Sequence, residues 1–222
     1  MIIVHHLENS RSQRILWLLE ELGVPYDIKR YARDRKTLLA PEALRTVHPL
    51  GKSPVITDGE VTVAESGAII EYLLGRYGEY RLKPDPGTPE ALRYTYWLHY
   101  AEGSLMPPLV MKLVFARIKK QPGPIALRPV VHLICNKVLS TFVNPQVQLH
   151  LRYVEGELRK TSWFAGEDFT AADIQMSYPL EVAAGRASFD EHPRLVAWLQ
   201  QIHSRPAYQR ALQRGGPLTA FD

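Results

Sequence analysis

Residues 48–72 read HPLGKSPVITDGEVTVAESGAIIEY and hold two short β-branched runs, 55–57 and 61–63, on either side of Asp58-Gly59. An Asp-Gly between such runs is one of the strongest local signals for a β-hairpin. After Ser66, apolar residues recur at helical spacing, namely Ile69, Ile70, Leu73 and Leu74. The stretch therefore predicts a strand, a tight turn, a second strand and then a helix that opens at Ser66.

The start of this helix carries two features that suggest binding. Ser66 lies at the expected N-cap, where unpaired backbone N–H groups attract a carboxylate or phosphate. Glu65 adds a negative charge beside that anion site, and an α-amino acid head group would use both charges. The pair is therefore either a helix cap with a neighbouring acid or a site for a zwitterion. Nearby, Pro54 must open its strand, because proline donates no ladder hydrogen bond, and the isomer of its peptide bond stays open.

The segment GKSPV, followed by AES at a helix start, resembles the glutathione site of the glutathione S-transferase family. The resemblance implies that the backbone of Ser53, before a cis Pro54, binds the cysteinyl part of glutathione. It also implies that Glu65 and Ser66 hold the γ-glutamyl head group, and that Lys52 lies along the tripeptide. It extends over residues 1 to about 212 and implies glutathione as a cosubstrate.

Composition fits a soluble globular protein and excludes some classes. Of the 222 residues, 45% are hydrophobic and 23% charged, which suits one large domain or two modest ones. The net charge of +4 is scattered, which argues against a nucleic-acid partner. Cys135 is the only cysteine, so no internal disulfide forms, and its apolar helical context predicts a buried, inert thiol. We expect no bound metal.

The N-terminal ten residues, MIIVHHLENS, lack the basic leader and long apolar core of a signal peptide. No apolar run reaches the roughly 20 residues of a membrane-spanning helix. We therefore expect a cytoplasmic protein with no membrane span. His5 and His6 follow a short strand and point to opposite faces, so they are interpreted as structural.

Asn9 and Ser10 precede a helix whose stop signals are Gly23 and Pro25. Through residue 78 the expected order is strand, helix, strand, helical segment, strand, strand, helix, which is the thioredoxin arrangement. A hydroxyl at the start of the first helix would lower the pKa of a ligand thiol, which is about 8.5 when free. Ser10 is thus either an N-cap or a group that stabilises a ligand's thiolate.

The S-x-x-x-R pattern from Ser10 to Arg14 resembles the serine-type members of the same family. The resemblance implies a catalytic role for Ser10, which Asn9 can share or take over. The cysteine of omega-like and glutaredoxin-like members is absent here. Many relatives place a histidine within the segment 31–47 to hold the glycine carboxylate of glutathione, and none lies at that spacing. Arg35 or Lys36 would substitute, unless this segment is simply a solvated charged face.

The sequence GEYRLKPDPGTP marks a linker, which divides the chain into a domain at 1–78, a linker at 79–88 and a helical domain at 89–222. In the helical domain we expect a first helix kinked at Pro107-Pro108 and a second over about 129–160, bent at Pro145. Segment 116–128, between them, is a place where this chain can differ from relatives. Thr170 and Asp173 predict a capping box.

The expected fold is an α/β thioredoxin-like N-terminal domain followed by an all-α C-terminal domain. The resemblance implies a glutathione S-transferase whose thiolate attacks a hydrophobic electrophile. The candidates for the electrophile pocket, which are also consistent with plain core, are Tyr100, Ser104, Met106 and Met111. The resemblance further implies a homodimer, in which Glu102 would reach the partner's γ-glutamyl amine.

Two other functions stay open. One is a glutathione-dependent peroxidase, lyase or dehalogenase on the same fold, since each of these also uses a thiolate. The other is a non-catalytic module that binds a ligand or a protein. The intact set of Lys52, Ser53-Pro54 and Glu65-Ser66 argues against the second.

Overall fold

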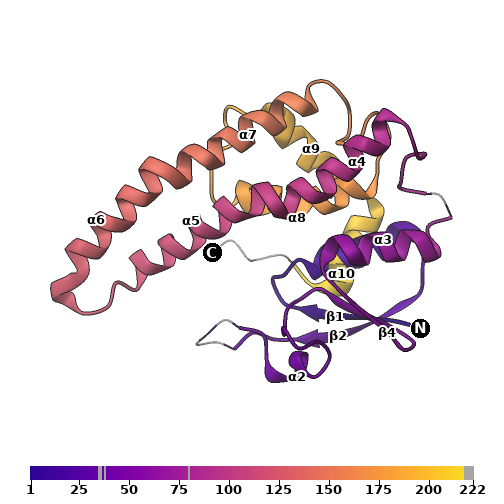
Figure 1. Cartoon of the computed structure of the whole chain (residues 1–222), viewed down its shortest axis with the longest axis horizontal. Coiled ribbons are helices and arrows are strands. Elements are labelled where there is room, and N and C mark those ends of the chain that lie inside the picture. The colour runs from indigo at the N-terminus through magenta and orange to yellow at the C-terminus, as the bar shows by residue number, and fades with distance from the viewer. Residues whose placement is uncertain (35–36, 38, 80, 218–222) are drawn as a thin grey trace.

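The first third of the chain forms a small sheet with its own helices, and the rest of the chain is helical (Figure 1). The computed structural model describes residues 1–34, 37, 39–79 and 81–217. The elements of the first third are β1 (Ile2–Leu7), α1 (Ser12–Leu22), β2 (Tyr26–Tyr31), α2 (Glu42–Arg45), β3 (Val55–Asp58), β4 (Val61–Ala64) and α3 (Ser66–Tyr77). This order confirms the predicted thioredoxin arrangement.

The sheet has the strand order β2-β1-β3-β4, with β1 and β2 parallel and the other pairs antiparallel. The predicted hairpin is present: Val55 pairs with Ala64, and Gly59 supplies the positive φ of 62° in the turn. The apolar sides of α1 and α3 bury one face of the sheet, whereas α2 lies on the other (Figure 1). The start of α1 and the start of α3 therefore lie close to β1 and β3.

Within the residues that the structure describes, the helical part has ten segments. They are α4 (Pro89–Tyr100), η1 (Ala101–Leu105), α5 (Met106–Lys120), η2 (Ile125–Leu127), α6 (Arg128–Val138), η3 (Leu139–Val143), α7 (Asn144–Leu158), α8 (Ala171–Ala184), α9 (Pro193–His203) and α10 (Pro206–Gly215). Helix α8 is buried along nearly its whole length and contacts α1 and α4. It is therefore the helix that seats the helical part on the thioredoxin-like part.

Two long continuous helices, α4–η1–α5 and α6–η3–α7, each change from α-helical to π-helical winding just before a proline. The prolines at 107 and 108 lie in the first turn of α5, directly after the π-helical segment η1. Pro145 lies likewise in the first turn of α7, after the π-helical segment η3. A proline lacks the N–H that an α-helical bond needs, and a π turn accommodates that gap. The predicted kink and bend thus take the form of π segments within otherwise continuous helices.

The predicted capping box is confirmed at the start of α8. The carboxylate of Asp173 accepts from the backbone N–H of Thr170 at 3.0 Å, and Thr170 Oγ1 accepts from the N–H of Ala172 at 3.3 Å. Asp173 also accepts from the N–H of Phe164 at 3.0 Å and from Nε1 of Trp198 at 3.3 Å. One carboxylate therefore ties the start of α8 to the preceding loop and to α9.

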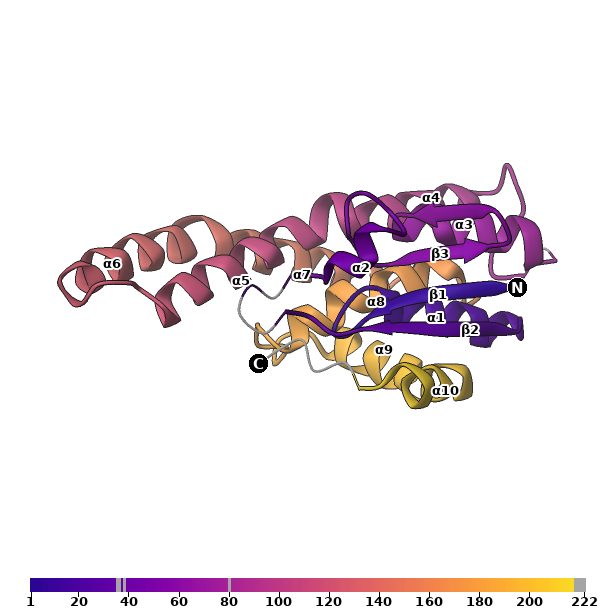
Figure 2. The ribbon, with the colours of Figure 1, turned by 90° about the horizontal axis from the view of Figure 1, so that it is seen from below.

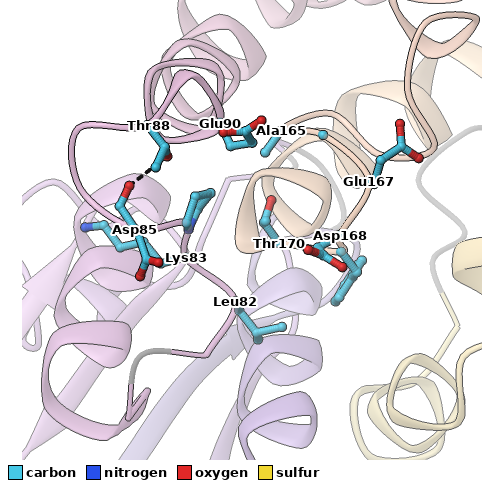
Figure 3. A pocket seen from close by; sticks show the side chains of 12 residues that line it. Leu82, Lys83, Asp85, Thr88, Glu90, Ala165, Glu167, Asp168 and Thr170 are labelled. Carbon is cyan, nitrogen blue, oxygen red and sulfur yellow. Dashed lines mark hydrogen bonds between the residues drawn. The ribbon is translucent and has the colours of Figure 1, made fainter.

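A cavity of about 390 Å³ lies where the linker meets the loop before α8 (Figure 3). Leu82, Lys83 and Asp85 line one side of it, and Glu167 and Asp168 line the other. The carbonyl of Leu82 accepts from the N–H of Ala171 at 2.9 Å, so the cavity borders a direct contact between linker and α8. None of the residues predicted for glutathione lines it.

The distal part of α5 and the whole of α6 project from the body of the molecule (Figures 1 and 2). We call residues 110–142 the distal arm. Cys135 is buried within it, as predicted for an inert thiol. By length and composition, one helix in the described part of the chain, Ile125–Leu158, would be able to cross a membrane. Its C-terminal half instead contributes Val147, Leu151 and Val154 to the core.

Candidate functional site

Ser53 and Ser10 lie side by side although 43 positions separate them. The Ser53–Pro54 peptide bond is cis, and β3 begins one residue later. The hydroxyl of Ser53 donates to the carbonyl of His5 at 3.2 Å and lies 3.2 Å from Oγ of Ser10. The hairpin and the end of β1 thus bring together two residues that the sequence singled out separately.

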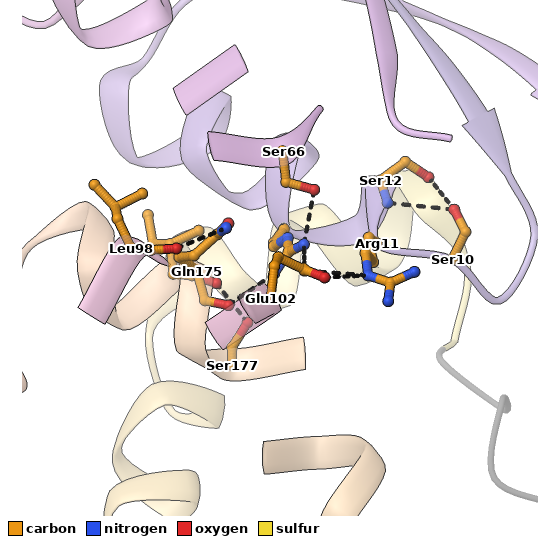
Figure 4. Close-up of polar contacts among 10 residues, drawn as sticks. Ser10, Arg11, Ser12, Ser66, Leu98, Glu102, Gln175 and Ser177 are labelled. Carbon is orange, nitrogen blue, oxygen red and sulfur yellow. Dashed lines mark hydrogen bonds and ion pairs between the residues drawn. The ribbon is translucent and has the colours of Figure 1, made fainter. Parts of the chain in front are cut away.

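Ser10 is buried, two residues before α1 begins at Ser12. Its Oγ accepts from the backbone N–H of Ser12 at 3.2 Å and lies 2.7 Å from Oγ of Ser12 (Figure 4). Asn9, with φ of 50°, lines a different cavity, together with His6 and Gly215. Ser10 lines that cavity too, but of the pair it alone also lines the cavity that contains Lys52 and Ser53.

At the start of α3 the structure corrects one expectation. Ser66 is the first residue of the helix rather than its N-cap, and Glu65 occupies the N-cap position. The hydroxyl of Ser66 accepts from Nη2 of Arg14 at 2.7 Å and caps nothing. Glu65 has φ of 70° and ψ of 125°, a conformation that costs a non-glycine residue about 1–3 kcal/mol. Such strain clusters at binding sites, where neighbouring structure fixes the backbone.

Arg14 is buried and binds three different partners, whereas the sequence marked it only as the last residue of the S-x-x-x-R pattern. Its guanidinium donates to Ser66 Oγ and to the carbonyl of Gln175, each at 2.7 Å, and pairs with the carboxylate of Glu102 (Figure 4). Burial lowers the pKa of Arg14 from its ordinary value, and the charge of Glu102 partly restores it. A cation this deeply buried requires its acid partner.

The carboxylate of Glu102, in η1, forms ion pairs with two arginines at the start of α1. It pairs with Arg14 and also with Nε of Arg11 at 3.0 Å. Burial raises the pKa of this carboxyl, but the two guanidiniums outweigh it, so the pKa lies below the ordinary value. Within one chain, Glu102 is therefore engaged by residues of the thioredoxin-like part.

Two adjoining cavities of about 260 Å³ each surround these residues. The first lies at the start of α3 and is lined among others by Pro54, Glu65, Ser66 and Glu102. The second extends past Ser10 and is lined among others by Arg33, Arg45 and Tyr178. Both are lined by Arg11, Leu50, Lys52 and Ser53, so together they form one groove with an acidic end and a cationic end.

The four residues predicted for the electrophile pocket line neither of these cavities. Tyr100 is buried, and its hydroxyl hydrogen-bonds Nδ1 of His150, while Met106 is buried in the helical core. Ser104 and Met111 are half-buried. Beside Ser10 the wall is instead formed by Tyr178 of α8, whose ring lies 5.4 Å from the guanidinium of Arg11.

The positions predicted for the glycine carboxylate, Arg35 and Lys36, lie outside the described residues. The cations that do line the second cavity are Arg11, Arg33, Arg45 and Lys52. The guanidinium of Arg33 is held by backbone carbonyls, since Nη2 donates to the carbonyl of Asn9 at 3.1 Å and Nε donates to that of Glu8 at 3.2 Å. Among the described residues, no group of three or more His, Cys, Asp or Glu side chains is placed to hold a metal ion.

Comparison with known proteins gives two family matches and close relatives. Residues 10–74 match the model of the glutathione S-transferase N-terminal domain, and residues 126–206 match that of the C-terminal domain. Glutathione S-transferase 3 of Schizosaccharomyces pombe is 39% identical over 216 residues, which is 96% of this chain and 88% of that protein. Glutathione S-transferase 1 of Saccharomyces cerevisiae is 31% identical, over 98% of this chain and 97% of that protein.

Among solved structures, a glutathione S-transferase from Actinobacillus pleuropneumoniae superposes with a TM-score of 0.82 at 35% identity. The superposition covers 99% of this chain and 95% of that one. The similarity therefore includes both the sheet and the helical part.

Proposed function

The chain belongs to the glutathione S-transferase family, and on that premise we propose how its residues act on glutathione. It is a glutathione transferase with a thioredoxin-like and a helical part. Our proposal assigns residues 1–78 to glutathione binding, 79–88 to the linker and 89–222 to the electrophile side. Glutathione lies along the groove, and its thiol lies beside Ser10.

The acidic end of the groove suits the γ-glutamyl head group. The backbone N–H groups at the start of α3 bind its α-carboxylate, and the carboxylate of Glu65 binds its ammonium. Glu102 lines the same cavity and adds negative charge near the ammonium. The strained backbone of Glu65 supports this assignment, because strain of this kind is retained at binding sites and Glu65 lines this cavity.

The thiol assignment rests on one observation: the hydroxyl oxygens of Ser10 and Ser53 lie 3.2 Å apart, and Ser53 lines both cavities while Ser10 lines the second. The backbone of Ser53, before the cis bond, binds the cysteinyl unit, so the thiol falls next to Ser10. A hydroxyl that donates to the sulfur favours the thiolate over the thiol, whose pKa is about 8.5 when free. Catalysis then consists of lowering this pKa and placing the electrophile.

The cationic end of the groove binds the glycine carboxylate of glutathione and the electrophile. Lys52 and Arg45 line it and are positioned for the glycine carboxylate of glutathione. The electrophile lies against Tyr178 and Arg11, close to Ser10. Of the four residues predicted from sequence, none lines the groove, and Ser104 and Met111, which are half-buried, remain our candidates for the outer wall of the pocket.

A homodimer is part of the proposal. Exposed apolar side chains gather on the outer sides of α4 and α7, with Leu92 74% exposed and Leu149 52% exposed. Tyr96 and Tyr153 are exposed on the same two helices, and their rings stack with Tyr100 and Trp97 respectively. A patch of this kind fits a second copy of the chain. Leu92→Glu should shift the protein from dimer to monomer in analytical ultracentrifugation.

The test of the proposal is binding and titration of glutathione. Calorimetry with glutathione and with S-hexylglutathione should detect both, and thiolate absorbance against pH should place the pKa of the bound thiol below that of free glutathione. Ser10→Ala should raise this pKa by at least one unit with little loss of affinity. If the absorbance titration does not move, Asn9 or backbone N–H groups hold the thiolate. Folded protein without glutathione binding would favour the non-catalytic module.

A second group of functions uses the same thiolate. A glutathione-dependent peroxidase, lyase or dehalogenase would bind glutathione and lower its pKa in the same way. A panel of aryl halides, epoxides, peroxides and haloalkanes, measured with wild-type protein, separates these reactions. The protein is proposed to act in the cytoplasm.

A further inference from the structure

Three buried side chains form a hydrogen-bonded line that starts at Ser10 and leads away from the groove. Oγ of Ser10 lies 2.7 Å from Oγ of Ser12, and Oγ of Ser12 lies 2.8 Å from Nδ1 of His6. Ser12 is fully buried and His6 is 5% exposed. The sequence interpretation treated His6 as structural, yet it lies at the inner end of a path from the groove.

The partners of His6 decide the direction of these hydrogen bonds. Nε2 lies 3.0 Å from the carbonyl of Gly215, which can only accept, so Nε2 carries the hydrogen. Nδ1 of the neutral ring is then an acceptor and takes the hydroxyl hydrogen of Ser12. Oγ of Ser12 in turn accepts from Ser10. Each hydrogen in the line therefore points inward, toward His6.

We propose that His6 receives the proton that the glutathione thiol loses, through the hydroxyls of Ser10 and Ser12. The inference rests on the proposed function and adds a destination for the proton. The thiol proton passes to Oγ of Ser10, the proton of Ser10 passes to Oγ of Ser12, and the proton of Ser12 passes to Nδ1 of His6. The products are a thiolate that accepts from Ser10 and an imidazolium that donates from both nitrogens. No other reactant is needed.

The surroundings of His6 keep it neutral until the thiolate forms. Burial lowers its pKa, the carbonyl of Gly215 raises it, and the charge of Arg30 lowers it, with a net result below the ordinary value. Arg30 itself donates to the Gly215 carbonyl at 3.0 Å, and Glu8 lines the cavity next to His6. A thiolate two hydroxyl groups away adds the negative charge that stabilises the imidazolium. The two charges therefore form together.

The experiment compares the number of protons released on glutathione binding with the number of thiolates formed. Glutathione binding is measured by calorimetry at pH 7 in buffers of different ionisation enthalpy, which gives the protons released, and thiolate is measured by its absorbance. If His6 keeps the proton, the wild type forms more thiolate than it releases protons. Ser12→Ala interrupts the line but leaves Ser10 in place, so it should release one proton for each thiolate and raise the pKa of the bound thiol.

His6→Asn should match Ser12→Ala, and His5→Asn is the control. His5 is the adjacent buried histidine, bonded to Tyr31 at 2.9 Å and outside the line, so its replacement should leave the proton count unchanged. Equal numbers of protons and thiolates in the wild type would overturn the inference, and so would a Ser12→Ala variant with wild-type counts. Wild-type protein that does not bind glutathione would overturn the proposed function itself, which is a different result. S-Methylglutathione, which has no thiol proton, shows that each variant retains its binding site.

A separate observation concerns the distal arm. Between Glu102 and Glu155 the chain has no acidic residue, although it has 23 in all. The arm carries cations along the same stretch, namely Lys112, Arg117, Lys119, Lys120, Arg128 and Lys137. Its charge is therefore of one sign over both helices and the turn that joins them, so the expectation of a scattered positive excess is wrong for this part of the chain.

The distal arm also exposes large apolar side chains. Ile125 is 77% exposed and Leu133 is 71% exposed, and Leu127, Val130 and Ile134 are each more than half exposed. On α5, Val110, Val114 and Ile118 form an exposed stripe at four-residue spacing. Large apolar side chains exposed at helical spacing along both helices of the arm are typical of a protein or membrane contact.

We propose that the distal arm docks on the surface of an anionic lipid bilayer. Apolar side chains together with lysine and arginine are what an interfacial helix uses, the apolar groups entering the headgroup region and the cations contacting anionic lipids. Arm-to-arm pairing with a second copy would instead place like charges together. The arm projects from the body, so a flat surface can reach it (Figure 2).

Vesicle flotation tests this docking with the full chain. The protein should float with vesicles of phosphatidylcholine and phosphatidylserine, float much less with phosphatidylcholine alone, and be released by salt. Leu133→Glu with Ile134→Glu, and separately Lys119→Glu with Lys120→Glu, should each reduce flotation several-fold. Val196→Glu, an exposed apolar-to-acidic change on α9, is the matched control. Absence of flotation with anionic vesicles, or arm variants that change only the sedimenting mass, would overturn the proposal.

Discussion

The guanidinium of Arg14 pairs with the carboxylate of Glu102 across the boundary between the thioredoxin-like and helical parts. The same guanidinium holds the hydroxyl of Ser66 and the carbonyl of Gln175. Arg14 therefore fixes the start of α3, which forms the anion site, against η1 and α8. Glutathione binding and the seating of the helical part depend on one buried cation.

Replacement of Arg14 should separate these two roles. Arg14→Met leaves the Ser66 hydroxyl and the Gln175 carbonyl without their donor and leaves Glu102 paired with Arg11 alone, so it should lower the free energy of unfolding by about 2 kcal/mol or more. Adding Glu102→Leu removes a partly buried acid that has lost one of its two cations and should recover part of that loss. Urea unfolding measures the stability, and calorimetry measures glutathione affinity. Affinity should stay low in both variants, because Ser66 has lost its hydrogen-bond donor. Recovery of affinity in the double variant would show that Arg14 acts on the fold alone.

Two replacements of Glu65 should weaken glutathione binding equally but differ in stability. Both Glu65→Gly and Glu65→Ala remove the carboxylate and should weaken glutathione binding at least tenfold. Glycine accepts the positive φ without strain, whereas alanine keeps a Cβ, so the glycine variant should be more stable than the alanine variant by about 1 kcal/mol. Thermal unfolding and calorimetry on the same pair of proteins check both statements. An alanine variant as stable as the glycine variant would mean that the backbone at Glu65 is unstrained.

The wall of the electrophile pocket gives a prediction about specificity. Tyr178→Ala should raise the KM for an aryl halide several-fold and leave the KM for glutathione nearly unchanged, because Tyr178 is proposed as a wall for the electrophile and not as a contact of glutathione. Tyr100→Phe removes a hydroxyl that bonds His150 in the interior, so it should leave the KM for the electrophile unchanged. Steady-state kinetics with each substrate varied in turn distinguishes the two. If Tyr100→Phe raised the KM for the electrophile more than Tyr178→Ala did, the electrophile would bind beside Tyr100, as predicted from the sequence.

Local signals were sufficient for much of the fold. The Asp-Gly hairpin, the helix after Glu65-Ser66 and the capping box each depend on residues within a few positions of one another, and each is present. The prediction that Ser66 is the N-cap was wrong by one position, and the reason is physical. A serine can begin a helix as its N-cap or as its first residue, and here a donor from Arg14, 52 positions away, holds its hydroxyl.

The residues that sequence reasoning missed are held by long-range contacts. His6 gains its role from Gly215, 209 positions along the chain, because α10 packs beside α1. Tyr178 reaches the groove because α8 crosses α1, whereas the expected helix turns Tyr100 and Met106 inward. Helical spacing shows that these residues share a face, but only the packing shows which face borders the groove.

The capping carboxylate of Asp173 should make stability depend on pH in a particular direction. Burial raises the pKa of this carboxyl to about 6, from 3.8 in the unfolded chain, although four hydrogen bonds oppose the change. Between those values the native state holds a proton that the unfolded state has lost, so the contribution of Asp173 is full below pH 3.8 and declines as pH rises through about 6. Asp173→Asn does not titrate. The stability of the wild type relative to this variant should therefore fall by about 2 kcal/mol between pH 4 and pH 7. Urea unfolding of both proteins at matched pH measures this difference, and a difference that grows with pH would mean that the four hydrogen bonds outweigh burial.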